Sequence, residues 1–399
     1  CIFFFENMMK RILLYSGIAA FIVLWWYFAF TASQATVTPR HYATTVELSG
    51  GYTPPEIDRE QLCRALGGDY PLMLQLMLAW DLTAELLVDE GVEGIQRLSQ
   101  AALLTGVRDV DRHSPCLEEC DDRGHTLCLT DTLPKVLPQT YSAATVFLAL
   151  LPPERIIAIP RGLRYEEYID FGEKHIALDS DRHLSEALYR QEPSAAFVAS
   201  YSNPAAIHQL ERQGIPLFFW DKATSPQEIT HGITRLGNIV GEHHKGETLA
   251  LFVQAAIFAS ENYYLWCRHT SEAPLPERAL VLSYHTNYAG LTENNSVVQL
   301  LQSLGVAMAP LGSNLDWTIP LDRESVVQLD PDYILCLGRD LAARVYEERA
   351  FGDVIAVQEH RVFWVDSVVQ MSPSQYIALA YYDLCHALCQ GGLHAENTY

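Results

Sequence analysis

The chain has 399 residues, of which 49% are hydrophobic and 19% are charged, and this composition is that of a globular protein rather than a disordered one. It contains 27 Lys and Arg against 49 Asp and Glu, a formal net charge of −22. This balance, with no run of basic residues, excludes a general nucleic-acid binder. It leaves room for acidic patches that meet a basic partner, and the length allows two or three domains.

The first element is an uncharged apolar stretch, residues 12–32, directly after Lys10 and Arg11. It is long enough for one membrane span, and the small residues up to Ala35 offer a signal-peptidase site. Residues 8–35 are therefore predicted to be a signal peptide or a membrane anchor, and the sequence leaves both open. In either case we expect the rest of the chain to be periplasmic or otherwise extracytoplasmic, tied to the inner membrane by residues 12–32 if they are retained.

Residues 36–132 are predicted to form a polar tether followed by a helical segment, because apolar residues then recur at helical spacing. Three of the nine cysteines cluster with His125 in this segment, namely Cys116, Cys120 and Cys128. Their spacing fits no standard zinc pattern, so we favour a disulfide or free thiols over a metal site. Near the C-terminus, Cys385 and Cys389 are one helical turn apart, and core packing is the preferred interpretation.

From residue 133 short apolar strands alternate with helices, which indicates a parallel sheet flanked by helices. Residues 242–270 then keep helical spacing without a proline, and a helix of that length spans about 40 Å. After it the alternation restarts. The predicted fold class is α/β, with two doubly wound lobes, lobe 1 (133–241) and lobe 2 (271–393), joined by the single long helix and preceded by the apolar and helical N-terminal segments.

A local repeat links the two lobes. Glu186 precedes Pro193 and an apolar strand at the same interval by which Glu324 precedes Pro331 and the next such strand. Each glutamate falls in the first turn of a short predicted helix, with Ser185 or Asp322 as the N-cap. The plain interpretation is a capping acid, but matched positions in both lobes suggest two carboxylates that meet two arginines of a partner.

At this point the sequence resembles the substrate-binding proteins of ABC importers for siderophores, cobalamin and haem, whose two lobes are joined by one rigid helix. The resemblance covers about residues 133–390 and rests on KVLPQTYSAATVFLALLPPERIIAI, LSEALYRQEPSAAFVASYSNPAAIHQLERQGIPLFFW and DRESVVQLDPDYILCLG followed by VIAVQEHRVFWVD. It implies that Glu186 and Glu324 dock onto permease arginines. The chain departs from the family at Thr145-Val146, where TE is common, and at Pro193-Ser194, where PD is common.

Ligands of open α/β sheets lie beyond the carboxyl ends of the strands. The aromatic and cationic side chains expected there suit a flat, partly apolar ligand, an iron(III) chelate of the siderophore type or a corrinoid. Haem is less favoured, because haem-binding relatives tend to carry a Tyr just before the docking glutamate of lobe 1, where this chain reads DSDRHLS. The predicted ligand-binding residues are Tyr141, Arg161, Arg164, Tyr165, Tyr201, Tyr288, Trp317 and Met371.

No enzyme motif of the GxSxG, HExxH, GxxxxGK[ST] or GxGxxG type is present, and no catalytic residue, resident metal or cofactor is predicted. The expected protein is a monomeric capture protein whose partners are an ABC permease and a metal chelate, without nucleic acid. Two alternatives stay open, a chelatase-like enzyme on a two-lobed fold and a membrane-anchored sensor or adaptor.

Overall fold

The computed structural model describes residues 56–80, 117–129, 134–165, 178–180, 186–221, 223, 225–270, 278–311, 317–365 and 373–389. The predicted signal or anchor segment, the tether, Cys116, Ser185 and Met371 lie outside these residues. Among the helices that the structure does describe, none combines the length and the apolar character needed to cross a membrane. We keep lobe 1 and lobe 2 as names for the regions predicted from the sequence.

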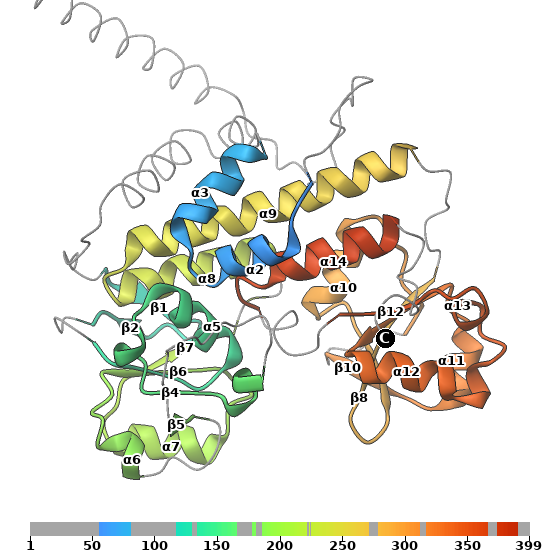
Figure 1. Ribbon diagram of the computed structural model, residues 1–399. Coiled ribbons are helices and arrows are strands. Elements are labelled where there is room, and N and C mark those ends of the chain that lie inside the picture. Colours follow the sequence, from blue (N-terminus) through green and yellow to red (C-terminus); the bar gives the residue numbers. More distant parts are fainter. Residues whose placement is uncertain are drawn as a thin grey trace, which may run out of the picture.

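Lobe 1 is built on short parallel strands (Figure 1). Strands β3, β6 and β7 lie side by side in that order, and a bridge between Val136 and Ile156 connects the parallel pair β4–β5 to β3. The residues of β6 are all buried, as expected for a strand covered on both faces. The elements are β3 (Val136–Pro138), α5 (Tyr141–Leu150), β4 (Ala158–Ile159), β5 (Leu178–Asp179), α6 (Glu186–Tyr189), β6 (Ala195–Val198), α7 (Pro204–Arg212), β7 (Leu217–Phe219) and α8 (Pro226–Ile239).

Lobe 2 has a five-stranded mixed sheet in the order β10–β9–β8–β11–β12. Strands β8, β11 and β12 are parallel, as the alternating pattern predicted, whereas β9 and β10 add an antiparallel edge that was not predicted. A short turn after Tyr284 suffices for the β8–β9 pairing. The elements are β8 (Ala279–Tyr284), β9 (Tyr288–Leu291), α10 (Ser296–Ser303), β10 (Thr318–Leu321), α11 (Arg323–Leu329), β11 (Tyr333–Leu337), α12 (Arg339–Glu347), α13 (Ile355–Gln358), β12 (Val362–Val365) and α14 (Ile377–Cys389).

One long helix, α9 (His243–Thr270), runs between the lobes and confirms the predicted linking helix of 242–270. Figure 1 shows it above both lobes, beside α8 and α14. At the α8–α9 crossing, a Cβ on Gly246 would come within 3.1 Å of the Gly237 Cα, so both glycines permit the close approach. The middle of α9 is buried on nearly every side, including Leu251, Phe252 and Val253.

The N-terminal helices α2 (Arg59–Leu66) and α3 (Tyr70–Ala79) cover α9 and α14 rather than forming a separate unit (Figure 1). The Trp80 ring stacks on Phe252 of α9 at 5.7 Å between centroids. Arg59 makes a two-pronged ion pair with Asp383 of α14, with both N···O distances 2.9 Å. The predicted helical segment is thus confirmed in part, and it belongs to the core around the linking helix.

The described cysteines include both disulfide-bonded residues and free thiols. Cys128 is disulfide-bonded, while Cys120 is an exposed free thiol. Cys385 is buried, as predicted, but Cys389 is not a packing residue: it forms a disulfide with Cys267 of α9, with 5.8 Å between their Cα atoms. Local spacing could not predict this pair, because the two cysteines are 122 residues apart in the sequence. In the described part of the chain, no group of three or more His, Cys, Asp or Glu is arranged to hold a metal ion.

Candidate ligand cleft

Two exposed aromatic residues meet where the lobes face each other. Tyr201 follows β6 in lobe 1, and Trp317 precedes β10 in lobe 2. Their ring centroids are 6.3 Å apart in an edge-to-face arrangement, although the exposed fractions of the two residues are 61% and 50%. Both were predicted to bind ligand. Such large exposed aromatic surfaces are typical of a site that takes a partner or ligand.

The Tyr201 hydroxyl lies near polar groups of lobe 1. It is beside Ser142, at the start of α5, and the Asp221 carboxylate. Desolvation of the hydroxyl raises its pKa, and the nearby negative charge of Asp221 raises it further. The phenol is therefore neutral at physiological pH, able to donate a hydrogen bond to an anionic group or to lose its proton to a metal.

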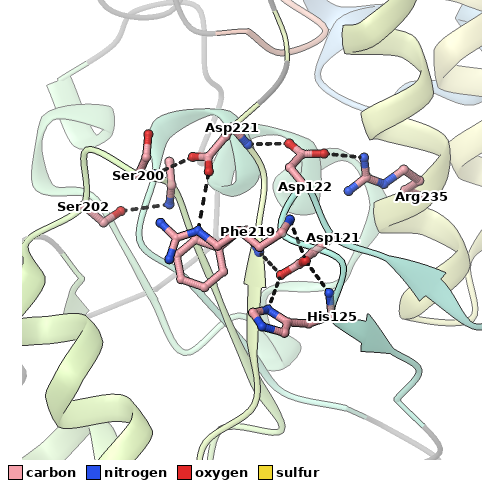
Figure 2. Close-up of polar contacts among 10 residues, drawn as sticks. Asp121, Asp122, His125, Ser200, Ser202, Phe219, Asp221 and Arg235 are labelled. Carbon is pink, nitrogen blue, oxygen red and sulfur yellow. Dashed lines mark hydrogen bonds and ion pairs between the residues drawn. The ribbon is translucent and has the colours of Figure 1, made fainter.

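A chain of hydrogen bonds supports the loop that carries Tyr201 (Figure 2). The Ser200 N–H donates to Oδ1 of Asp221, and the Asp221 N–H donates to Oδ2 of Asp122 at 2.6 Å. The Arg235 guanidinium of α8 donates in turn to Oδ1 of Asp122 at 2.9 Å. Because the Asp122 and Arg235 side chains are only 6% and 9% exposed, this ion pair is a buried anchor for the cleft edge.

Asp122 belongs to a hairpin that sequence analysis did not identify, formed by β1 (Glu119–Cys120) and β2 (Thr126–Leu127). The hairpin covers the open edge of β7, where the Asp122 N–H donates to the Phe219 carbonyl at 3.0 Å. Arg123 lies over the Phe219 ring at 3.4 Å from its centroid. The N-terminal segment therefore completes lobe 1 beside the loop that carries Tyr201. The sequence feature that could have pointed to this hairpin is the acidic stretch CLEECDDRGH.

Asp121 fixes this hairpin from inside (Figure 2). Its carboxylate accepts hydrogen bonds from the backbone N–H groups of His125, Arg123 and Phe219, at 2.7, 2.9 and 3.1 Å. Burial alone would raise the pKa of this carboxyl, but the backbone donors outweigh burial and lower it. His125, considered as a possible metal ligand, is bonded to Asp121 through Nδ1 at 3.1 Å. This is an arrangement for turn stability rather than for metal binding.

A second group of predicted residues gathers after β3 and β4. Thr140 is the N-cap of α5 and accepts from the Ala143 N–H, which places Tyr141 in the first turn. The Tyr141 hydroxyl lies so close to Gly162 that any side chain there would collide with it. Tyr141 and Arg161, which directly precedes Gly162, therefore belong to neighbouring segments of lobe 1. Both are half-buried.

The remaining predicted ligand residues fare differently. Arg164 is paired with Asp179 at 2.8 Å, so part of its charge is already neutralised. Tyr288 is only 6% exposed and packs between Tyr284 and Phe351, at centroid distances of 5.1 and 5.3 Å. This corrects its prediction as a ligand residue, because β9 turns its side chain into the core of lobe 2. The Tyr165 side chain and Met371 lie outside the described part of the chain.

The two predicted docking glutamates occupy equivalent helix starts. Glu324 is exposed in the first turn of α11, where the predicted N-cap Asp322 accepts from the Ser325 N–H at 2.7 Å. Glu186 is the first residue of α6. The neighbouring Arg323 is bonded to Glu348 rather than to Glu324, at 2.6 Å.

No protein-family model and no curated protein sequence matches this chain. Solved structures do. The periplasmic heme-binding protein RhuT from Roseiflexus sp. RS-1 is 20% identical with a TM-score of 0.54, over 65% of this chain and 98% of RhuT. The heme-binding protein HmuT is 17% identical with a TM-score of 0.56, over 70% of this chain and 95% of HmuT. The molybdate periplasmic binding protein MolA of a Haemophilus influenzae ABC transporter is 14% identical with a TM-score of 0.57, over 68% and 91%. The chain therefore has the two-lobed α/β fold of periplasmic ABC-transporter binding proteins, with a long linking helix.

Proposed function

We propose that this protein captures a planar iron chelate of the haem type in the cleft between its lobes and delivers it to an ABC permease. The observation that carries the proposal is the exposed pair Tyr201 and Trp317, one from each lobe, at the point where the lobes meet. Two of the similar structures are named as heme-binding proteins. This moves the preferred ligand from the siderophore-like chelate predicted first to haem.

The chemistry of the cleft suits such a ligand. A tyrosine oxygen is a known protein ligand for haem iron, and the indole of Trp317 offers a flat apolar surface for the macrocycle. Arg161 directly precedes Gly162, which lies against the Tyr141 hydroxyl, and would provide a cation for haem carboxylates. The protein supplies binding and orientation and no chemical step, so the proposed role is that of a binding protein rather than an enzyme.

The disulfides support an extracytoplasmic location. Cys267 and Cys389 are bonded to each other, and Cys128 is also disulfide-bonded. Structural disulfides form and persist in oxidising compartments and are rare in the cytosol. The apolar residues 12–32 would then serve for export, as a cleaved signal or as a retained anchor.

The test is a titration of the full chain with haem, followed by the Soret absorbance, with a ferric siderophore and cobalamin in parallel. We expect saturable haem binding, and Tyr201→Phe should weaken it at least tenfold and change the Soret spectrum, because the iron loses an oxygen ligand. Tyr263→Phe is the matched control, since Tyr263 stacks on His386 away from the cleft loops. The proposal is wrong if haem does not bind, or if Tyr201→Phe binds it as well as the native chain does. Demetallation of the bound haem would instead favour the chelatase alternative.

Permease docking is tested separately. Glu186→Lys combined with Glu324→Lys should abolish stimulation of the permease ATPase in proteoliposomes while leaving haem affinity unchanged, because each lobe loses one carboxylate and gains a repulsive charge. Glu347→Lys, at an exposed acid in the last turn of α12, is the control for charge reversal away from the two helix starts. Normal stimulation by the double variant would refute the docking role.

A further inference from the structure

A cavity of about 180 Å³ lies where the linking helix meets both lobes. Its walls come from the start of α8 in lobe 1, the middle of α9, and α10 and α14 in lobe 2. None of the residues predicted to bind ligand lines it. The residues that matter for its chemistry are Pro226, Gln254, Ile257, Glu261, Ser303 and Tyr381.

Glu261 is the unusual member of this lining. It is only 7% exposed, and its Oε2 is buried without any hydrogen-bond partner among the described residues. The Oε1 of Gln254, two helical turns earlier on the same helix, is also buried and unpartnered. Buried polar atoms are nearly always hydrogen-bonded, and an orphaned carboxyl oxygen costs free energy. Two unmet acceptors on one cavity wall indicate that the cavity receives a donor.

Among the described residues, no basic side chain compensates a negative charge on Glu261. No Lys or Arg lines the cavity among the described residues. The Cys385 thiol of α14 is within electrostatic range of the carboxylate. Tyr381, whose hydroxyl is 3.4 Å from Ser303 Oγ, also lines the cavity. Burial accordingly raises the pKa of Glu261 to about 8. The acid is protonated at neutral pH until a cation arrives.

Ile257 and Pro226 give the lining an apolar part, beside the polar residues Ser225, Gln227 and Gln299. A ligand that satisfies this cavity needs donors at one end and a short hydrocarbon part at the other. A metal ion fits less well, because in the described part of the chain no three His, Cys, Asp or Glu are close enough to hold one. An ammonium group has three donors for the Glu261 and Gln254 oxygens.

We propose that this cavity is a binding site for a small primary alkylammonium cation, with Glu261 as its counter-ion and Gln254 as a second acceptor. The site is separate from the proposed ligand cleft and does not depend on haem binding. Binding at neutral pH converts the carboxylic acid to a carboxylate, so one proton leaves Glu261 for the solvent for each cation bound. Because α8, α9, α10 and α14 all contribute, an occupied site also joins both lobes to the linking helix.

The experiment is isothermal titration calorimetry of the full chain at pH 7 with n-butylammonium as the probe. The same titration with n-butanol and with butyrate tests the need for the positive charge. Repetition in buffers of different ionisation enthalpy counts the protons released. We expect saturable binding of n-butylammonium with close to one proton released, and no binding of the alcohol or the anion.

Glu261→Gln keeps the size of the side chain and should weaken n-butylammonium binding at least tenfold and abolish the proton release. Glu247→Gln, on the same helix but outside the cavity, should bind like the native chain. The proposal fails if n-butylammonium does not bind, if n-butanol binds equally well, or if Glu261→Gln still binds with proton release. Haem affinity is measured on the same samples, so failure of this site is distinguished from failure of the proposed cleft.

Discussion

The two sides of the boundary between the lobes are built in opposite ways. On the linking-helix side, Arg155 is 3% exposed and its guanidinium donates to the Glu242 carboxylate at 2.9 Å and to the Val240 carbonyl at 3.0 Å. On the same side, the buried Gln375 donates to the carbonyls of Leu66 and Thr145, at 3.3 and 2.8 Å, and so joins three parts of the chain.

On the cleft side, contact between the lobes is made by aromatic rings that stay largely open to solvent, Tyr201 against Trp317. The stability of the two-lobed arrangement therefore comes from the contacts on the linking-helix side. The contact between the lobes on the cleft side is weak, so it can open without disturbing the core. Elements that bind and move ligands are expected at the low-stability end of a structure.

The largest effect is expected from Arg155→Met, which leaves the Glu242 carboxylate without its main partner. Loss of one partner of a buried ion pair costs about 3–5 kcal/mol, and the remaining contact with Lys245 at 3.0 Å keeps the expected loss near about 3 kcal/mol. The free energy of unfolding in guanidinium chloride measures it. Arg164→Met is the control, because its pair with Asp179 is about one-third exposed and is worth about 1 kcal/mol or less. Equal losses in both variants would contradict the contrast between the two sides.

A smaller effect is expected from pH at the linking helix. The folded chain keeps the Glu261 proton up to about pH 8, whereas the unfolded chain loses it near 4.5. The folded state then binds more protons between these values, so the free energy of unfolding falls as pH rises through this window and levels off above it.

Glu261→Gln should lack this slope, because its side chain does not ionise. At pH 8 it should be more stable than the native chain by about 2 kcal/mol. The gain is no larger because water entering the cavity of the native chain relieves part of the cost of the buried acid. Chemical unfolding at several pH values, in buffers free of primary amines, measures the difference. Parallel pH profiles for the two proteins would show that the pKa of Glu261 is the same in the folded and the unfolded chain. Glu247→Gln should keep the native slope.

The smallest effect on stability is expected at the cleft mouth. Trp317→Ala removes an exposed ring and should change the free energy of unfolding by less than about 0.5 kcal/mol. The same variant should lower haem affinity about tenfold, because the macrocycle loses a flat apolar contact. Unfolding and Soret titration on one preparation compare the two. A large loss of stability with unchanged haem affinity would show that Trp317 supports the fold and does not bind the ligand.

Much of the architecture follows from local pattern. Apolar strands such as those after Pro193 and Pro331 can be predicted from the sequence, because a strand buried on both faces is a continuous hydrophobic run. The long helix follows from unbroken periodicity without proline, and the Asp322 cap follows from the preference of first-turn donors for a side-chain acceptor. Tyr201 and Trp317 could be singled out because loops at the carboxyl ends of strands carry ligands in this kind of sheet.

Other features depend on the packing of distant segments. The sequence alone determined two α/β lobes, their linking helix and the candidate loops, since each depends on residues close together in the chain. Only the tertiary structure decided that Tyr288 is buried, that Asp122 holds the cleft edge through Arg235, and that Cys267 is bonded to Cys389. These features join residues far apart in the chain, or depend on which face of a strand meets the core. No local spacing encodes such contacts, because burial and partner choice are fixed only when the elements pack.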